Sequence, residues 1–125
     1  EYFNNTTRTG PPFATRCENA PLNYNLSSGN PGIAGLPGSE WSARYTGFFP
    51  FVEGIYLFNA ACGLYDAAAL MLDGATVLSD TITGRAVWSS QKSVFVSAGN
   101  HTVVVEWADT NGYSNIIQAG WQYQH

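Results

Sequence analysis

Apolar and polar residues alternate along the middle of this chain, in short segments bounded by glycines. In residues 41–46, Trp41, Ala43 and Tyr45 fall on one face of an extended segment, and polar or charged side chains fall on the other. The same two-residue period recurs in residues 54–62. This is the period of a β-strand with one buried face. The middle of the chain is therefore predicted to form a series of half-buried strands.

Turn residues join these segments into an all-β pattern. Asp73-Gly74 lies between two apolar runs and favours a hairpin, because a tight turn needs positive φ at both central residues. We expect a second hairpin at residues 98–100 and an edge strand at residues 1–3. The rest of the first forty residues is rich in Pro, Gly, Asn and Ser, and little regular structure is expected there. The pattern predicts an antiparallel two-sheet β-sandwich.

Composition limits the classes of function. The chain has 125 residues, the size of one domain, and we treat residues 1–125 as a single domain. Charged residues are only 11% of the chain and the net charge is −4, so no basic surface is expected and nucleic acid is not a predicted partner. No apolar run approaches the roughly 18 residues of a membrane span. Because the chain begins at Glu1, we expect a mature product or a module of a larger extracellular protein.

Two kinds of residue favour an extracellular or cell-surface location. Cys17 and Cys62 permit one internal disulfide, and the alternative is a pair of reduced thiols. Four N-x-[ST] sequons are candidate glycosylation sites, although chance occurrence is an equally good explanation in a chain rich in Asn and Thr. The four asparagines are Asn4, Asn5, Asn25 and Asn100.

Residues 41–74 contain aromatic strand segments, Gly47, Gly54 and Asp73-Gly74 in a characteristic order. In this order the chain resembles the protective-antigen-type (PA-fourteen) domain family of bacterial toxins, fungal adhesins and glycosidases. Further matching segments cover nearly the whole chain: residues 1–5, 22–24, 98–99, 105–107 and Trp121. The resemblance implies a two-sheet β-sandwich that binds glycans or mediates contacts and has no catalytic activity. It also implies that Cys17 lies near Cys62, and we predict a disulfide between them.

The resemblance locates a ligand site. Calcium-dependent lectins of the family carry two adjacent aspartates, and the bound Ca²⁺ coordinates sugar hydroxyls. The corresponding residues here are Tyr65 and Asp66, so one carboxylate is missing and we predict that no cofactor is required. Our first hypothesis is that Tyr65 stacks on a sugar ring. The predicted ligand-binding residues are Tyr65, Asp66, Asn111 and Tyr113.

Two other interpretations of Asp66 stay open. It is a candidate Ca²⁺ ligand together with Asp109 and Asn111, and Asn115 lies in the same region of the chain. Alternatively, it is a turn or capping residue that binds nearby backbone groups.

Most aromatic residues are assigned to the core, including Trp41, Tyr45, Tyr56, Phe58 and Trp107. Phe49, Phe51 and Trp88 are further candidates for exposed rings. No catalytic residue is predicted. Glu53 and Glu106 lie on separate strands, and neither His101 nor His125 has the sequence neighbours of a metal site or a nucleophilic triad.

The leading hypothesis is a non-enzymatic extracellular carbohydrate-binding or adhesion module, whose partners are glycans or cell-surface and extracellular proteins. The alternative is a structural β-sandwich, a spacer or subunit of a surface filament or sheath without a sugar site. In that case the strand edge at residues 1–5 would pair with a neighbouring copy.

Overall fold

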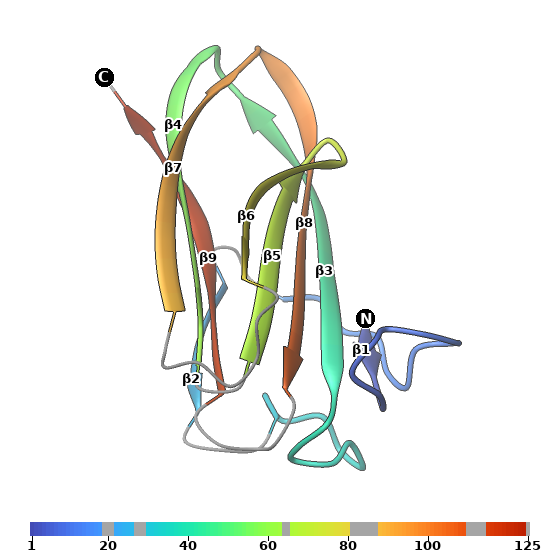
Figure 1. Ribbon diagram of the computed structural model, residues 1–125. Coiled ribbons are helices and arrows are strands. Elements are labelled where there is room, and N and C mark those ends of the chain that lie inside the picture. Colours follow the sequence, from blue (N-terminus) through green and yellow to red (C-terminus); the bar gives the residue numbers. More distant parts are fainter. Residues whose placement is uncertain (19–21, 27–29, 64–65, 81–87, 110–114, 125) are drawn as a thin grey trace.

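The computed structural model describes the chain except residues 19–21, 27–29, 64–65, 81–87, 110–114 and 125. The described residues form two antiparallel sheets that lie face to face, as Figure 1 shows. The predicted β-sandwich is therefore confirmed. Among these residues, no helix is long and apolar enough to cross a membrane.

Each sheet combines strands from distant parts of the chain. The five-stranded sheet has, in order, β1 (Tyr2–Phe3), β3 (Ser42–Phe51), β8 (Gly99–Asp109), β5 (Asp66–Leu72) and β6 (Ala75–Asp80). The four-stranded sheet has β2 (Leu22–Leu26), β9 (Asn115–Gln124), β4 (Gly54–Cys62) and β7 (Trp88–Val96). All neighbouring strands in both sheets run antiparallel.

One of the two predicted hairpins is present. β5 and β6 pair across a turn in which Asp73 has φ of 50° and Gly74 has φ of 83°, which confirms the Asp-Gly hairpin. The hairpin predicted at residues 98–100 is wrong, because β7 belongs to the four-stranded sheet and β8 to the five-stranded sheet. The turn before β8 therefore crosses from one sheet to the other, as the turn between β3 and β4 also does.

The sandwich interior is built from the inward-facing residues of both sheets. Trp41, Trp107 and Phe58 are fully buried, as the alternation predicted, and the Trp41 and Trp107 ring centroids lie 4.5 Å apart. Phe51 is only 5% exposed, so its selection as an exposed ring is wrong. It points inward because it shares the parity of Tyr45 and the other inward residues of β3. The Trp88 side chain lies outside the described part of the chain.

The N-terminal edge strand is present, but its outer edge is covered. The Tyr2 amide donates to the Ala14 carbonyl at 2.8 Å, and the Phe13 amide donates to the Tyr2 carbonyl at 2.7 Å. Residues 13–14 of the same chain thus occupy hydrogen-bonding groups that a neighbouring copy would need. The expectation of an uncovered edge at residues 1–5 is therefore wrong.

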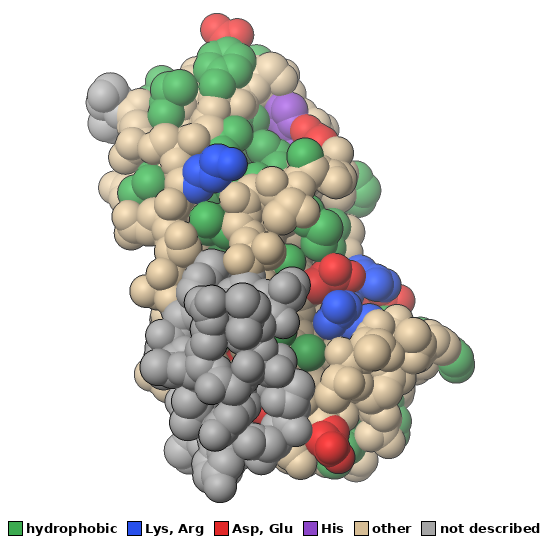
Figure 2. Space-filling model, viewed as in Figure 1, with side chains coloured by type: hydrophobic (Ala, Val, Ile, Leu, Met, Phe, Trp, Pro, Cys, Tyr) green, Lys and Arg blue, Asp and Glu red, His purple; other side chains and the backbone are tan. Residues whose placement is uncertain are grey.

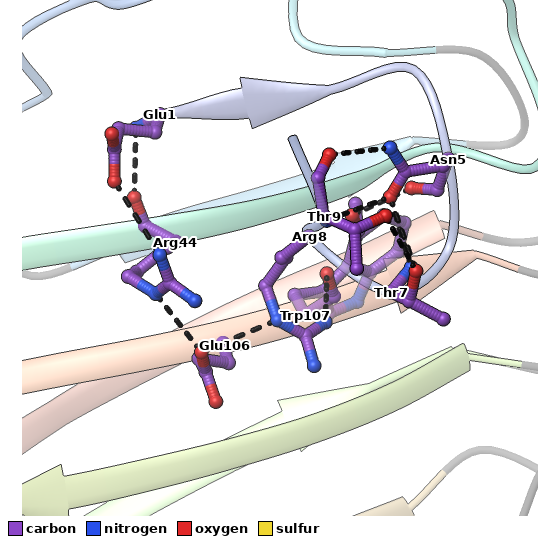
Figure 3. Close-up of polar contacts among 9 residues, drawn as sticks. Glu1, Asn5, Thr7, Arg8, Thr9, Arg44, Glu106 and Trp107 are labelled. Carbon is purple, nitrogen blue, oxygen red and sulfur yellow. Dashed lines mark hydrogen bonds and ion pairs between the residues drawn. The ribbon is translucent and has the colours of Figure 1, made fainter. Parts of the chain in front are cut away.

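Charged residues fasten the N-terminal segment to the outer face of the five-stranded sheet (Figure 3). The Glu106 carboxylate lies 3.3 Å from Arg8 Nε and 3.0 Å from Arg44 Nε. Arg44 Nη1 also lies 3.6 Å from a carboxylate oxygen of Glu1. Glu106 on β8 therefore links the N-terminal segment, through Arg8, to β3, through Arg44.

The predicted disulfide is not formed. Cys17 is exposed on the segment before β2, whereas Cys62 is fully buried at the end of β4 and belongs to the interior cluster that contains Trp41 and Trp107. The Cys62 thiol donates a hydrogen bond to the Asp66 carbonyl oxygen, with the sulfur and the oxygen 3.7 Å apart. Inward strand parity directs Cys62 into the interior, away from the exposed segment that carries Cys17.

Candidate functional site

The candidate site lies at the end of the sandwich where β5 begins and β8 ends, and Figure 1 shows these two strand ends side by side. Asp66 and Asp109 are direct partners in the strand register and are 2% and 0% exposed. Asp66 points inward because it shares the parity of Ala68 and Leu70, both buried. Asn115, the first residue of β9, is also fully buried. We call Asp66, Asp109 and Asn115 the carboxylate site.

The two oxygens of the Asp66 carboxyl have different surroundings. Oδ2 accepts hydrogen bonds from the backbone amides of Gly63 at 2.8 Å and Ile116 at 3.2 Å. This side chain thus links the end of β4 to the start of β9, in agreement with the capping interpretation. Oδ1 is buried and has no hydrogen-bond donor within the part of the chain that the structure describes. Capping therefore explains one oxygen and leaves the other unexplained.

The electrostatics of this site disfavour two bare carboxylates. Burial raises the pKa of Asp66 to about 8, and the neighbouring Asp109 carboxyl adds to the rise, while the amides of Gly63 and Ile116 oppose it. A buried charge is costly unless an opposite charge or a proton neutralises it. The site therefore favours either a proton or a bound cation.

The donor set indicates which cation would fit. Two carboxylates and one side-chain amide offer only oxygen ligands, the type that Ca²⁺ prefers. The donor-free Oδ1 of Asp66 is available for such an ion. In the described ranges, no group of three or more His, Cys, Asp or Glu side chains is arranged to hold a metal ion. The carboxylate site therefore has the type of ligand atom that Ca²⁺ prefers, but its negative charge is low because it contains only two carboxylates.

The structure brings together two of the residues selected from sequence. Asp66 and Asp109 are adjacent, whereas Tyr65, Asn111 and Tyr113 lie outside the described residues and stay predictions. Asn115 was placed in the same region of the chain but was not among the selected ligands. Its signal was present in the sequence, because Asn115 is the polar member of an inward-facing series that continues with Ile117 and Ala119.

The sequon asparagines differ in exposure. Asn4, Asn25 and Asn100 are exposed, whereas Asn5 is half-buried and its side-chain amide donates to the Thr9 carbonyl at 3.0 Å. Glycosylation at all four stays a prediction, and Asn5 would have to leave its loop contact to accept a glycan.

His101 has neighbours that the sequence did not indicate. Its Nδ1 lies 2.5 Å from Asp73 Oδ2, and its Nε2 lies 2.8 Å from the Ser97 carbonyl and 3.3 Å from Ser97 Oγ. The Asp73 carboxylate and the Ser97 carbonyl both accept hydrogen bonds, so these contacts favour the protonated ring, and the Asp73 contact raises the pKa of His101. The contact between Asp73 and His101 fastens the β5–β6 hairpin to β8.

Solved structures of other proteins contain a similar fold. No protein-family model and no curated protein sequence matches the chain. A solved anti-sigma factor domain-containing protein superimposes with a TM-score of 0.80 at 17% identity, covering 98% of this chain and 41% of that one. A β-glucosidase from Kluyveromyces marxianus matches with a TM-score of 0.74 at 17% identity, over 99% of this chain and 17% of the enzyme. The chain therefore shares its fold with less than half of each of these larger proteins.

Proposed function

We propose that this chain is a non-enzymatic, extracellular carbohydrate-binding or adhesion domain of the protective-antigen type, with its ligand site at the carboxylate site. One observation carries the proposal: Asp66 and Asp109 are buried opposite each other, and Asp66 Oδ1 has no donor among the described residues. A fold stabilised by these carboxyls alone would bear the cost of burying them. A cation would offset that cost.

Calcium is the cation that this oxygen set supports. Asp66, Asp109 and Asn115 would hold it, and the ion would supply positive charge that coordinates sugar hydroxyl groups. This revises the expectation that no cofactor is required. Because only two carboxylates contribute, we expect weak affinity, in the range of about 10⁻⁴–10⁻³ M typical of extracellular modules. Tyr65 and Tyr113 remain our candidates for stacking on the sugar beside the ion.

The fold match to part of a larger enzyme supports an accessory role. The matched region is a small fraction of the Kluyveromyces marxianus β-glucosidase, an enzyme whose name indicates action on glucosides. A domain of this fold in such an enzyme is compatible with sugar binding in this chain, although a shared fold alone does not define a function.

A structural or self-assembling module is the second candidate, and exposed apolar side chains favour it. Ile55 and Phe95 are direct cross-strand partners on β4 and β7 and are 43% and 59% exposed, and Phe48 is 74% exposed. Figure 2 shows hydrophobic side chains near the end of the molecule opposite the carboxylate site, with a few charged side chains among them. Such exposed apolar side chains would be covered in an assembly.

A calcium titration combined with a glycan array tests the proposal. Calorimetric titration is expected to show one Ca²⁺ site, and glycan binding is expected to disappear when a chelator is added. Asp66→Asn should abolish both, whereas the matched control Glu53→Gln, an exposed acid, should change neither. Calcium binding without glycan binding would indicate a structural metal site that does not bind sugar. Glycan binding that persists in chelator and is lost in Tyr65→Ala would show that stacking on Tyr65, and not coordination by Ca²⁺, holds the sugar. Absence of both calcium and glycan binding would favour the structural module.

A further inference from the structure

A cavity of about 410 Å³ opens at the side of the sandwich, between β3 and the strands β2 and β9. It reaches the inner faces of both sheets. Its deep walls are Leu70, Val103 and Val105 from the five-stranded sheet and Leu22, Ala119 and Trp121 from the four-stranded sheet. We call it the side cavity. None of the three carboxylate-site residues lines it.

The side cavity is large for the interior of so small a domain. Protein interiors are close-packed, and voids larger than a water molecule are few. Pockets that bind small molecules typically measure about 300–1,000 Å³ and have mostly apolar walls. The side cavity has this size and this lining, so it is suited to a ligand.

Aromatic rings form one wall. Phe49 and Trp121 meet edge to face with ring centroids 4.7 Å apart, and Tyr45 also lines the cavity. Gly47 makes room for this arrangement, because a Cβ atom there would lie 2.5 Å from Phe49 Cε2. Glycine at position 47 therefore allows the Phe49 ring to lie close to the backbone at the cavity wall.

Charged residues at the mouth already have partners. Arg16 Nη2 lies 2.8 Å from Glu18 Oε1, and Glu18 also accepts hydrogen bonds from Tyr2 and Tyr24. Arg44, also at the mouth, is paired with Glu106. A charged ligand would have to compete with these pairs.

Deeper in the cavity, Leu70, Val103, Val105 and Ala119 have no polar side-chain atoms. Sugar hydroxyls buried against them would lose hydrogen bonds to water without replacement. We infer that the side cavity binds an uncharged, mainly apolar small molecule that contains a ring, independently of the proposed carbohydrate site.

The protein provides its own reporter for this site. Cys17 lines the side cavity and is exposed, whereas Cys62 is buried. A small alkylating reagent such as iodoacetamide should therefore modify Cys17 selectively in the folded protein. A ligand in the cavity should shield Cys17 from the reagent.

The test uses the uncharged fluorophore phenylnaphthylamine, with chelator present so that calcium has no influence. We expect saturable one-site binding and a several-fold slower alkylation of Cys17 at saturation. Ala119→Phe places a ring inside the cavity and should weaken binding by about tenfold or more. Phe95→Ala removes an exposed apolar ring elsewhere and is the matched control; it should bind as the parent does.

Three results would overturn the inference: no saturable binding, unchanged Cys17 alkylation at saturation, or loss of binding in Phe95→Ala. Undiminished binding in a folded Ala119→Phe protein, judged by circular dichroism, would overturn it too. If Ala119→Phe fails to fold, the alkylation rate of the parent protein decides, because that measurement needs no variant. None of these results depends on whether the carboxylate site binds calcium or sugar.

Discussion

The replacement of Glu18 by glutamine gives a sharp test of how the N-terminal segment is held over the sandwich. Glu18 Oε2 accepts a hydrogen bond from Tyr24 at 2.5 Å, and Oε1 accepts from Arg16 Nε at 2.8 Å and from Tyr2. Its side chain is 12% exposed, so solvent screens these contacts only in part. Glutamine keeps the shape but loses the charge and one acceptor oxygen.

The expected loss follows from the number and type of these contacts. A hydrogen bond to a charged group contributes about 1.5–3 kcal/mol, and contacts to one shared carboxylate are not additive. We therefore expect Glu18→Gln to lower the free energy of unfolding by about 3 kcal/mol. With an unfolding entropy of about 2.1 cal/mol/K per residue, 125 residues give about 0.26 kcal/mol/K, and Tm should fall by about 10 °C.

The pH dependence has a defined sign. Burial acts to raise the pKa of Glu18, but hydrogen bonds from Tyr2, Tyr24 and Arg16 outweigh burial and lower it. A lowered carboxyl pKa stabilises the fold above the ordinary Glu pKa of about 4.3, and this stabilisation is lost as the pH falls through the folded value. The stability gap between the parent and Glu18→Gln should therefore be full at neutral pH and shrink in acid.

Urea denaturation of both proteins across this pH range provides the measurement. Glu53→Gln is the matched control, because Glu53 is exposed, and it should follow the parent at every pH. A loss below about 1 kcal/mol at neutral pH, or a gap that does not change in acid, would refute the argument that this carboxylate holds the segment.

The contact with Asp73 raises the pKa of His101, so the stability from this pair is full below the ordinary His pKa of about 6.5 and is lost as the pH rises through the folded value. A urea series on His101→Gln should show that this pH dependence is lost, and an unchanged pH profile would contradict the assignment. A thiol titration should find one reactive group, Cys17, in the folded protein and two after unfolding, and the intact mass should not change on reduction; a gain of two hydrogens would reveal a disulfide with Cys62. Gly74→Ala should destabilise by about 1 kcal/mol because Gly74 has φ of 83°, and a neutral result in urea denaturation would mean that the turn relaxes.

Local sequence pattern predicted the fold class because each strand carries its own period. The inward faces of β3, β4 and β8 could be assigned from alternation alone, and Asp73-Gly74 specified its turn. Neither the alternation nor the turn residues could predict which strands pair with each other. The turn before β8 has the chemistry of a hairpin, yet β7 and β8 belong to different sheets. Which sheet a strand joins depends on long-range packing, which no local turn signal contains.

The candidate site was only partly predictable for the same reason. Asp66 and Asp109 were selected by resemblance, but their direct opposition depends on the register between β5 and β8. Asn115 was noted in the same region but was not selected as a ligand, and a polar residue at the start of an apolar strand usually lies in solvent. The disulfide failed because the presence of two cysteines gives no information on whether they approach each other, and Cys62 faces the interior.

The strand order has a consequence for how this chain folds. Among the described strand pairs, β5–β6 joins neighbours in sequence, and the others bring together segments separated by at least one further strand. Such distant pairings require long loops to close before they gain stability, which places folding on the slow side, in about milliseconds to seconds. The β5–β6 hairpin can form early. Asp73 then binds the backbone of Thr102 and can align β8 on it, so one aspartate in a tight turn links the fastest event of folding to the assembly of the larger sheet.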